Sequence, residues 1–511
     1  MSLRRFSPRS PAVIALLLVV VPHIAAAEET ASAPDLTVTI RIEIGDRAEL
    51  DVLTRLVSIE NVRGHAVWAV ATPRQLENLR EAGWSWQVAP AMRRATEPGM
   101  CAEGWVDDGN RSWTCYPSYQ QYEALMLKYA TDHPDICQLV DLGPTTNTVQ
   151  PHRLWALIIS DHPRDEEDEP EVLLTSTMHG DETTGYILTL RLVDHLVRGY
   201  GNESEITSLV DGTELWINPL ANPDGTYFGG DDTVADAIRY YTTSDGADSK
   251  INPNRNFPDF EDGDHPDGNP WWPETEAMMA LAEANTFVLS ANFHGGAELV
   301  NYPWDTLERR HPDDIWFRTL ARGWANLVQA DSPGGYFIDQ ENGISNGWDW
   351  YEINGGRQDF MTFFQGGREV TIELSETKLL PPGDLDELWL WNRRAFLSFV
   401  AHAQRGIRGV VTDANGTPLA ATIEVLGIDR EEDGSTVRTD PDVGDYHRLL
   451  LPGLYDLRIE APDFALQEIH GVAVVDGQAT VADVVLHRVI RRPTHRAAPN
   501  HGKKAPRLVL E

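Results

Sequence analysis

The chain has 511 residues, of which 41% are apolar and 24% charged, and this composition indicates a globular protein with roughly two to four domains. Its formal net charge of −37 disfavours binding to nucleic acid or to an anionic membrane surface, because both would repel it. The acidity fits either a solvated surface or attraction of basic ligands.

The N-terminus has the pattern of a secretory signal. Arginines at positions 4, 5 and 9 precede the apolar run 12–21, and three alanines at 25–27 offer a cleavage site. The run is shorter than the roughly 20 residues needed to span a bilayer, which argues against a membrane anchor. We expect residues 1–27 to be removed and the protein to be secreted or periplasmic.

The next segment, 28–100, alternates strand and helix patterns and predicts a small α+β module. Its expected strands are 36–44 and 66–72, and its expected helices are 48–57 and 73–83. Cys101 and Cys115 flank a polar, glycine-containing loop and are predicted to form a disulfide, which an oxidising compartment permits. Cys137 lies in an alternating apolar stretch and is predicted to be buried.

Residues 112–405 read as an α/β domain, a mixed or mostly parallel sheet with helices on both faces. Ser118 and Gln121 form a capping box that predicts a helix start. The expected strands are 154–159, 172–177, 215–218, 287–293 and 369–374, and the later helices are 187–197, 275–284 and 384–405.

From Gly406 the pattern changes to short strands at close spacing, with a turn signal at Asn415-Gly416. This predicts an all-β sandwich over 406–489. The basic, proline-containing end 490–511 is predicted to be a disordered tail.

The piece TMHGDETTG places His179 and Glu182 three residues apart at the end of a predicted strand, where α/β sheets bind ligands. We expect His179 on the loop after this strand and Glu182 in the first turn of the helix that follows. Alone, the pair is a weak signal and is more often a solvated turn. His294 also follows a predicted strand, and a lone histidine there is often structural. Together the three side chains supply the ligand set of a catalytic zinc, which needs three protein ligands and an open position.

Other polar clusters follow. Asn254 and Arg255, in INPNRNFPDF, offer an amide and a guanidinium fork that suit a carboxylate. Alternatively, the segment is a surface turn with a solvated arginine. Glu373 lies within an apolar strand, where a buried carboxylate is costly unless it is paired or used. Desolvation would raise its pKa toward that of a general base.

Six motifs occur in the order HGDE, NPDG, NPNRNFP, FHGGAELVNYPWD, WYEINGGRQDF and TIELSE. Residues 112–405 with these motifs resemble the zinc metallocarboxypeptidase family, in particular its regulatory, N/E-like branch. The sandwich is similar to the transthyretin-like domain of that branch, and the first module is similar in size to a propeptide.

The resemblance implies one zinc ion held by His179, Glu182 and His294. It implies that Glu373 is the general base that activates water. Arg239 falls where the family keeps an arginine that polarises the scissile carbonyl.

The resemblance also implies substrate contacts. Asn254 and Arg255 would bind the terminal carboxylate of a peptide or protein, and Tyr351 would close over it. Asp305 and Gln358 match pocket positions that select C-terminal Lys or Arg, although Asp305 could simply cap a turn.

One departure concerns Asn252, which stands where the family usually has an aspartate that accepts a hydrogen bond from a zinc-ligating histidine. An amide oxygen can orient the ring but makes the ligand less basic. Two other functions stay open on the sequence: a cell-wall peptidase, and a catalytically inactive binding protein.

Overall fold

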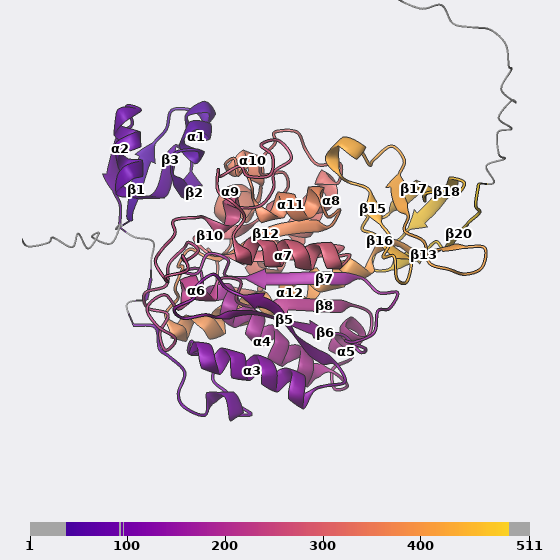
Figure 1. Cartoon of the computed structure of the whole chain (residues 1–511), viewed down its shortest axis with the longest axis horizontal. Coiled ribbons are helices and arrows are strands. Elements are labelled where there is room, and N and C mark those ends of the chain that lie inside the picture. Colours follow the sequence, from indigo (N-terminus) through magenta and orange to yellow (C-terminus); the bar gives the residue numbers. More distant parts are fainter. Residues whose placement is uncertain (1–36, 91–93, 96, 490–511) are drawn as a thin grey trace, which may run out of the picture.

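The computed structural model describes residues 37–90, 94–95 and 97–489. They form an N-terminal module, a central α/β part and a C-terminal sandwich, with the module and the sandwich at opposite ends of the α/β part (Figure 1). The predicted signal at 1–27 and the predicted tail at 490–511 lie outside the described residues. Among the described residues, no helix combines the length and apolar character needed to cross a bilayer.

The N-terminal module is a four-stranded antiparallel sheet, in the order β2-β3-β1-β4, with two helices. Its elements are β1 Val38–Glu43, α1 Arg47–Thr54, β2 Ser58–Arg63, β3 Ala66–Ala71, α2 Pro73–Glu81 and β4 Trp86–Val88. The predicted strands and helices are all present. The structure adds β4 and β2, and the latter carries the sequence SIENVR, which lacks regular alternation.

The central part is built on an eight-stranded mixed sheet in the order β11-β10-β12-β9-β7-β8-β6-β5. Its strands are β5 Cys137–Pro144, β6 Arg153–Ile159, β7 Glu171–Ser176, β8 Glu214–Asn218, β9 Leu289–His294, β10 Ala297–Tyr302, β11 Ile344–Asn346 and β12 Arg368–Ser375. The four middle strands, β12, β9, β7 and β8, are parallel, and antiparallel pairs flank them. Their carboxyl ends therefore meet at one edge of the sheet.

Helices cover both faces of this sheet, as predicted. One core holds α3 Tyr119–Asp132, α4 Thr184–Gly199, α5 Ser204–Val210, α8 Asp314–Asp331 and α12 Leu385–Ala401; the other holds α7 Pro273–Ala284 and α11 Arg357–Phe363. The remaining short helices are α6 Pro223–Thr226, α9 Asp339–Asn342 and α10 Gly347–Trp350. The predicted capping box of Ser118 and Gln121 begins α3. The long helix α8 was not among the predicted elements.

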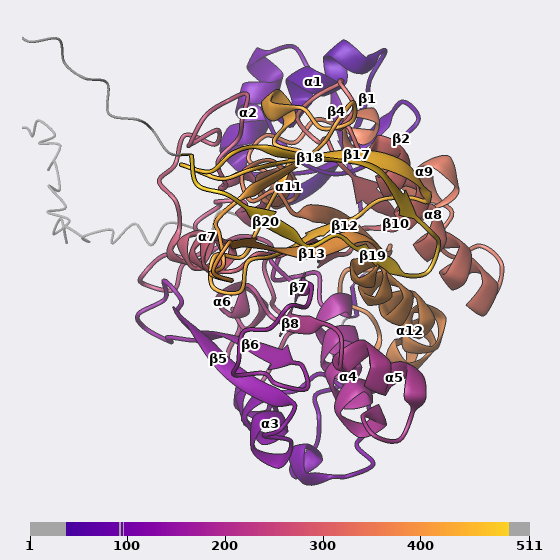
Figure 2. The same ribbon diagram turned by 90° about the vertical axis from the view of Figure 1, so that its right-hand side faces the viewer.

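The C-terminal part packs two small sheets, β16-β13-β19 with β20 beside β13, and β15-β14-β17-β18 (Figure 2). Its strands are β13 Gly406–Asp413, β14 Thr422–Val425, β15 Val437–Arg438, β16 Asp445–Arg448, β17 Gly453–Glu460, β18 Gln467–Val474, β19 Ala479–Val481 and β20 Val484–Leu486. Buried Arg448 joins it to the central part, with Nη2 2.8 Å from Asp313 Oδ1. A buried ion pair thus ties the predicted sandwich to the central part.

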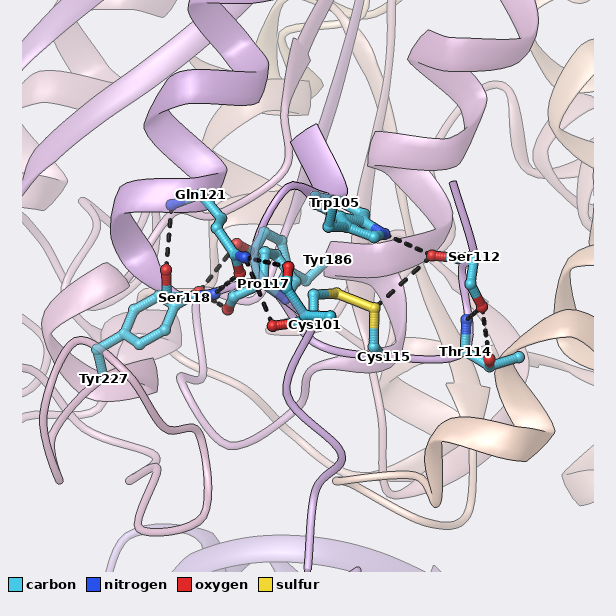
Figure 3. The surroundings of a disulfide bond; sticks show 11 residues. Cys101, Trp105, Ser112, Thr114, Cys115, Pro117, Ser118, Gln121, Tyr186 and Tyr227 are labelled. Atoms are coloured by element: carbon cyan, nitrogen blue, oxygen red, sulfur yellow. Dashed lines mark hydrogen bonds between the residues drawn. A yellow bond between two sulfur atoms is a disulfide. The ribbon is translucent and has the colours of Figure 1, made fainter. Parts of the chain in front are cut away.

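A disulfide links Cys101 to Cys115 just before α3 (Figure 3). The closed loop is further tied by Trp105, whose Nε1 donates to the Ser112 carbonyl at 2.6 Å, and by Gln121, whose Nε2 donates to the Ala102 carbonyl at 2.9 Å. Cys137 is a buried free thiol at the start of β5.

Candidate active site

The site lies at the carboxyl ends of the adjacent strands β7, β9 and β12. His179 and Glu182 follow β7, and His294 is the last residue of β9. Glu182 was expected in the first turn of the helix, but α4 begins only at Thr184. Glu182 instead lies in a tight turn, where its amide donates to the His179 carbonyl at 3.1 Å.

Three ligand-type atoms converge at this point. His179 Nδ1 is 3.0 Å from Glu182 Oε2, His294 Nδ1 is 2.8 Å from the same oxygen, and the two ring nitrogens are 3.1 Å apart. A point about 1.2 Å outside the plane of this triangle is about 2.1 Å from all three atoms, which is the ligand distance of zinc. All three side chains are buried. The geometry therefore fits one zinc ion.

The protonation state of His179 also fits a metal ligand. Its Nε2 is 2.9 Å from Asn252 Oδ1, which can only accept, so Nε2 carries the hydrogen and Nδ1 offers a lone pair. Burial, with the nearby charge of Arg239, holds the pKa of His179 well below its usual value. The ring is therefore neutral, as a metal ligand must be.

Two cations flank the other oxygen of Glu182. Arg239 Nη1 is 2.6 Å and Lys378 Nζ is 3.3 Å from Glu182 Oε1. Both cations also contact Glu60 of the N-terminal module, at 3.1 and 2.7 Å. Neither Lys378 nor Glu60 was predicted from the sequence, because the burial of each depends on partners that are distant in the chain.

Glu373 on β12 is aligned with His294 on the parallel strand β9. Its Oε2 is buried and has no hydrogen-bond partner among the described residues. Burial raises the pKa of Glu373 well above its usual value, and the charge of Glu182 adds to the shift. The carboxylate is thus poised to take a proton.

The residues expected to bind a terminal carboxylate lie beside the candidate metal ligands. Asn254 and Arg255 belong to a single turn, Pro253–Arg255, and Arg255 Nη1 donates to the Asn254 carbonyl at 2.7 Å. Both line one cavity of about 20 Å³ with Tyr351, the three metal ligands, Glu373 and Arg239. Glu60 lines the same cavity.

The two expected specificity residues lie one layer behind this cavity. Gln358 Nε2 donates to Asp305 Oδ1 at 3.0 Å, and Asn301, which does line the cavity, donates to the same oxygen at 2.8 Å. Burial raises the pKa of Asp305 to about 7. Asp305 and Gln358 therefore contact each other as a buried pair, but neither lines the cavity, whereas the sequence predicted both as pocket residues.

Comparison with known proteins decides the family. Residues 122–395 match the family described as zinc carboxypeptidase. The chain is a zinc carboxypeptidase. Residues 406–487 of this metallocarboxypeptidase match the carboxypeptidase regulatory-like domain, which confirms the expected regulatory-type branch.

Relatives of this zinc carboxypeptidase include the human carboxypeptidase N catalytic chain, 34% identical over 76% of this chain and 90% of the relative. Mouse carboxypeptidase M is 33% identical over 68% of this chain and 78% of the relative. The solved carboxypeptidase A of Helicoverpa armigera shares the fold, with a TM-score of 0.53 and 17% identity over 71% of this chain and 98% of that one.

Proposed function

We propose that the protein is a secreted enzyme that hydrolyses the last peptide bond of peptides or proteins, with a preference for C-terminal Lys or Arg. The observation that carries the proposal is the convergence of His179, Glu182 and His294 in one cavity with Glu373 and Arg255. Three candidate metal ligands, a carboxylate that can act as a base and a guanidinium that can bind a terminal carboxylate are the groups needed to hydrolyse the last peptide bond of a chain.

Zinc, when bound to the three ligands, would polarise the scissile carbonyl and make water more acidic. Glu373, with its unpartnered Oε2, takes the proton of the attacking water and passes it to the leaving amine. Arg239 lies close enough to stabilise negative charge that develops on the carbonyl oxygen.

Recognition of the chain end depends on a second group of residues. Arg255, assisted by Asn254, pairs with the terminal carboxylate, and an internal peptide bond has none to offer. Tyr351, buried beside Arg255, covers the bound end. The Arg255 guanidinium thus makes the enzyme an exopeptidase.

The preference for a basic end is supported by Asp305 and its partner Gln358, which lie directly behind the cavity-lining residue Asn301. An ionised Asp305 would attract an ammonium or guanidinium group, and the net charge of −37 steers basic peptides toward the protein. Secretion is supported by the sequence pattern of residues 1–27 and by the disulfide between Cys101 and Cys115.

The test is a panel of peptides that differ only in their last residue, Lys, Arg, Leu or Phe, with a muropeptide as the cell-wall alternative. Because Glu60 covers the cavity, the panel is run on the chain before and after proteolytic cutting of the segment that follows the N-terminal module. We expect release of the last residue, fastest for Lys and Arg, lost with a chelator and restored by zinc. Glu373→Gln should retain zinc and lose activity by on the order of 10²–10⁴-fold.

Cleavage of the muropeptide alone would select the cell-wall function. Zinc binding without hydrolysis of any substrate by the cut chain would point to a binding protein. Equal rates on all four peptides would remove the Lys/Arg preference and keep the peptidase.

A further inference from the structure

A group of carboxylates lies at the amino edge of the central sheet, opposite the candidate active site. Glu171 and Glu214 are the first residues of β7 and β8, and the register of this parallel pair sets them side by side. Both residues are more than nine-tenths buried. The arrow of β7 points away from the sandwich, so its first residue lies on the sandwich side of the sheet (Figure 1). Two buried like charges in this position repel each other.

Two more acids approach this pair from separate segments. Glu166 belongs to the loop before β7, and Asp440 comes from the turn between β15 and β16 of the sandwich. Thr286 holds Asp440 beside Glu171, because its amide donates to Glu171 Oε2 at 2.6 Å and its hydroxyl donates to Asp440 Oδ2 at 3.3 Å. One carboxylate oxygen from each of Glu166, Glu171 and Asp440 lies within 4.8 Å of the other two. We call these three residues, with Glu214, the acidic cluster.

No cation of the protein balances the acidic cluster. Among the described residues, no Lys, Arg or His nitrogen lies within 4.0 Å of any of its carboxylate oxygens. Burial, together with the charges of Glu214 and Glu166, raises the pKa of Glu171 well above its usual value. Burial and the charge of Glu214 raise the pKa of Glu166 to about 7. A buried group of like charges needs either protons or a bound cation to offset its repulsion.

A further buried oxygen beside the acidic cluster has no partner. Asp445 on β16 is buried, and its Oδ2 is 2.8 Å from His447 Nε2, whereas its Oδ1 has no hydrogen-bond partner among the described residues. The Asp440 amide donates to the Asp445 carbonyl at 2.9 Å, and besides burial the charge of Asp445 adds to the upward shift in the pKa of Glu166. An unpaired buried oxygen in such a place points to an ion or a water.

The donor atoms select the class of cation. Oxygens bound to one Ca²⁺ at about 2.3–2.6 Å lie at most about 5 Å apart, so the 4.8 Å limit of the acidic cluster is compatible with a single ion. Oxygen ligands suit Ca²⁺, which accepts several of them in irregular geometry, whereas Zn²⁺ prefers nitrogen or sulfur.

A route from solvent also exists. Glu167 and Asp168, the two residues after Glu166, line a cavity of about 1080 Å³ together with His447 of the sandwich. An ion can therefore approach the acidic cluster along the boundary between the catalytic part and the sandwich.

We propose that Glu166, Glu171 and Asp440 bind one Ca²⁺ ion, which ties the sandwich to the catalytic part. Glu214 and Asp445 add negative charge around the ion. The site is separate from the candidate zinc centre, because it lies at the opposite edge of the sheet, and it does not depend on the proposed peptidase function. A cation held by both parts stabilises their junction, since it binds the folded protein and not the unfolded chain.

The experiment uses the full, zinc-loaded chain after dialysis into calcium-free buffer. Titration calorimetry with CaCl₂ measures binding, and urea unfolding with and without excess calcium measures stability. MgCl₂ at the same concentration controls for ionic strength. We expect one calcium ion per chain, with a Kd on the order of 10⁻⁴ M, and a higher urea midpoint with calcium than with magnesium.

Glu171→Gln can keep the hydrogen bond from the Thr286 amide but removes one charge of the acidic cluster. It should weaken calcium binding by about 10-fold or more. In calcium-free buffer its urea midpoint should equal or exceed that of wild type, because repulsion is relieved, whereas in calcium wild type should have the higher midpoint. A purely structural role of Glu171 would lower the midpoint of the variant in both buffers and would overturn the site.

Asp440→Asn, on the sandwich side, should also weaken calcium binding by about 10-fold or more and serves if Glu171→Gln fails to fold. Asp442→Asn is the matched control, because it makes the same change at an exposed position of the same turn, and it should bind calcium as wild type does.

Three results would overturn the proposal. Wild type that binds no calcium at millimolar concentration would remove the site. Equal calcium affinity in wild type, Glu171→Gln and Asp440→Asn would place the ion elsewhere on this acidic protein. A rise in the urea midpoint that magnesium reproduces in full would assign the effect to screening of surface charge.

Discussion

His179 donates a hydrogen bond from Nε2 to Asn252 Oδ1 at 2.9 Å, and this contact sets which nitrogen of the ring faces the metal position. The same amide oxygen also accepts from the backbone amide of Asn254 at 2.9 Å. One neutral side chain therefore couples the candidate metal ligand to the turn that carries the proposed substrate-binding pair.

Replacing Asn252 by Asp should tighten zinc binding. A carboxylate in this position accepts the same hydrogen bond and makes the imidazole a more basic ligand, an effect on the order of 10–100-fold in affinity. Competition with a chromogenic chelator measures it, and Asn202→Asp on the surface controls for added negative charge. Equal affinity in wild type and Asn252→Asp would show that the partner of His179 does not tune the metal.

Replacing Asp305 by Asn should reduce the preference for Lys and Arg ends by on the order of 10–100-fold in the ratio of kcat/KM values for Lys- and Leu-ended peptides, because the negative charge behind the cavity that would attract a basic side chain is lost. Burial raises the pKa of Asp305 to about 7, so the carboxylate becomes ionised as pH rises through that value. The wild-type preference should therefore increase between pH 6 and about 8 and should be flat in Asp305→Asn.

Asp386→Asn on helix α12 removes the same charge far from the site and should leave both the ratio and its pH profile unchanged. A pH-dependent preference that survives in Asp305→Asn would assign the selection of basic ends to another group.

The convergence of the three candidate metal ligands could be predicted from the sequence because these residues are tied to local patterns. His179 and His294 each follow an apolar stretch that has to be a buried strand, and parallel strands bring such ends together. The order of the eight strands was not predictable, because it depends on pairings between segments distant in the chain. The apolar residues of helix α8 have helical spacing, so this helix could also have been predicted from the sequence.

Strand β2 and Glu60 could not be found in the same way. The bulge at Glu60 breaks the alternation that marks a strand, and its polar residues face another part of the protein rather than water. A segment of this kind has the sequence of an exposed loop. Lys378 was missed for a related reason, since its burial depends on Glu60 and Glu182.

Breaking the disulfide should destabilise the segment before α3. Cys101 and Cys115 are 14 positions apart in the sequence, and for a loop of this size the loss of loop-closure entropy in the unfolded chain corresponds to about 3 kcal/mol. The Cys101→Ser/Cys115→Ser double variant should lower the urea midpoint, and a reductant should lower that of wild type but not of the variant. Cys137→Ser is the control for loss of a thiol, and a midpoint in wild type that is insensitive to reductant would contradict the expectation.

Replacing Asp313 by Asn should destabilise the junction between the sandwich and the catalytic part. Asp313 pairs with Arg448 at 2.8 Å and with Arg368 at 2.7 Å, and removing its charge leaves two buried guanidinium groups without their shared anion. The cost of breaking such a buried pair is about 3–5 kcal/mol, whereas Asp314→Asn next to it should cost far less.

The pH dependence of this effect has a definite sign. The two arginines hold the pKa of Asp313 below its usual value, so its stabilising charge is present above about pH 4 and is lost as pH falls further. The difference between the urea midpoints of wild type and Asp313→Asn should therefore be constant from pH 6 to about 8 and shrink in acid. A difference that is small at neutral pH, or that grows as pH falls, would show that the sandwich is held by contacts other than this ion-pair network.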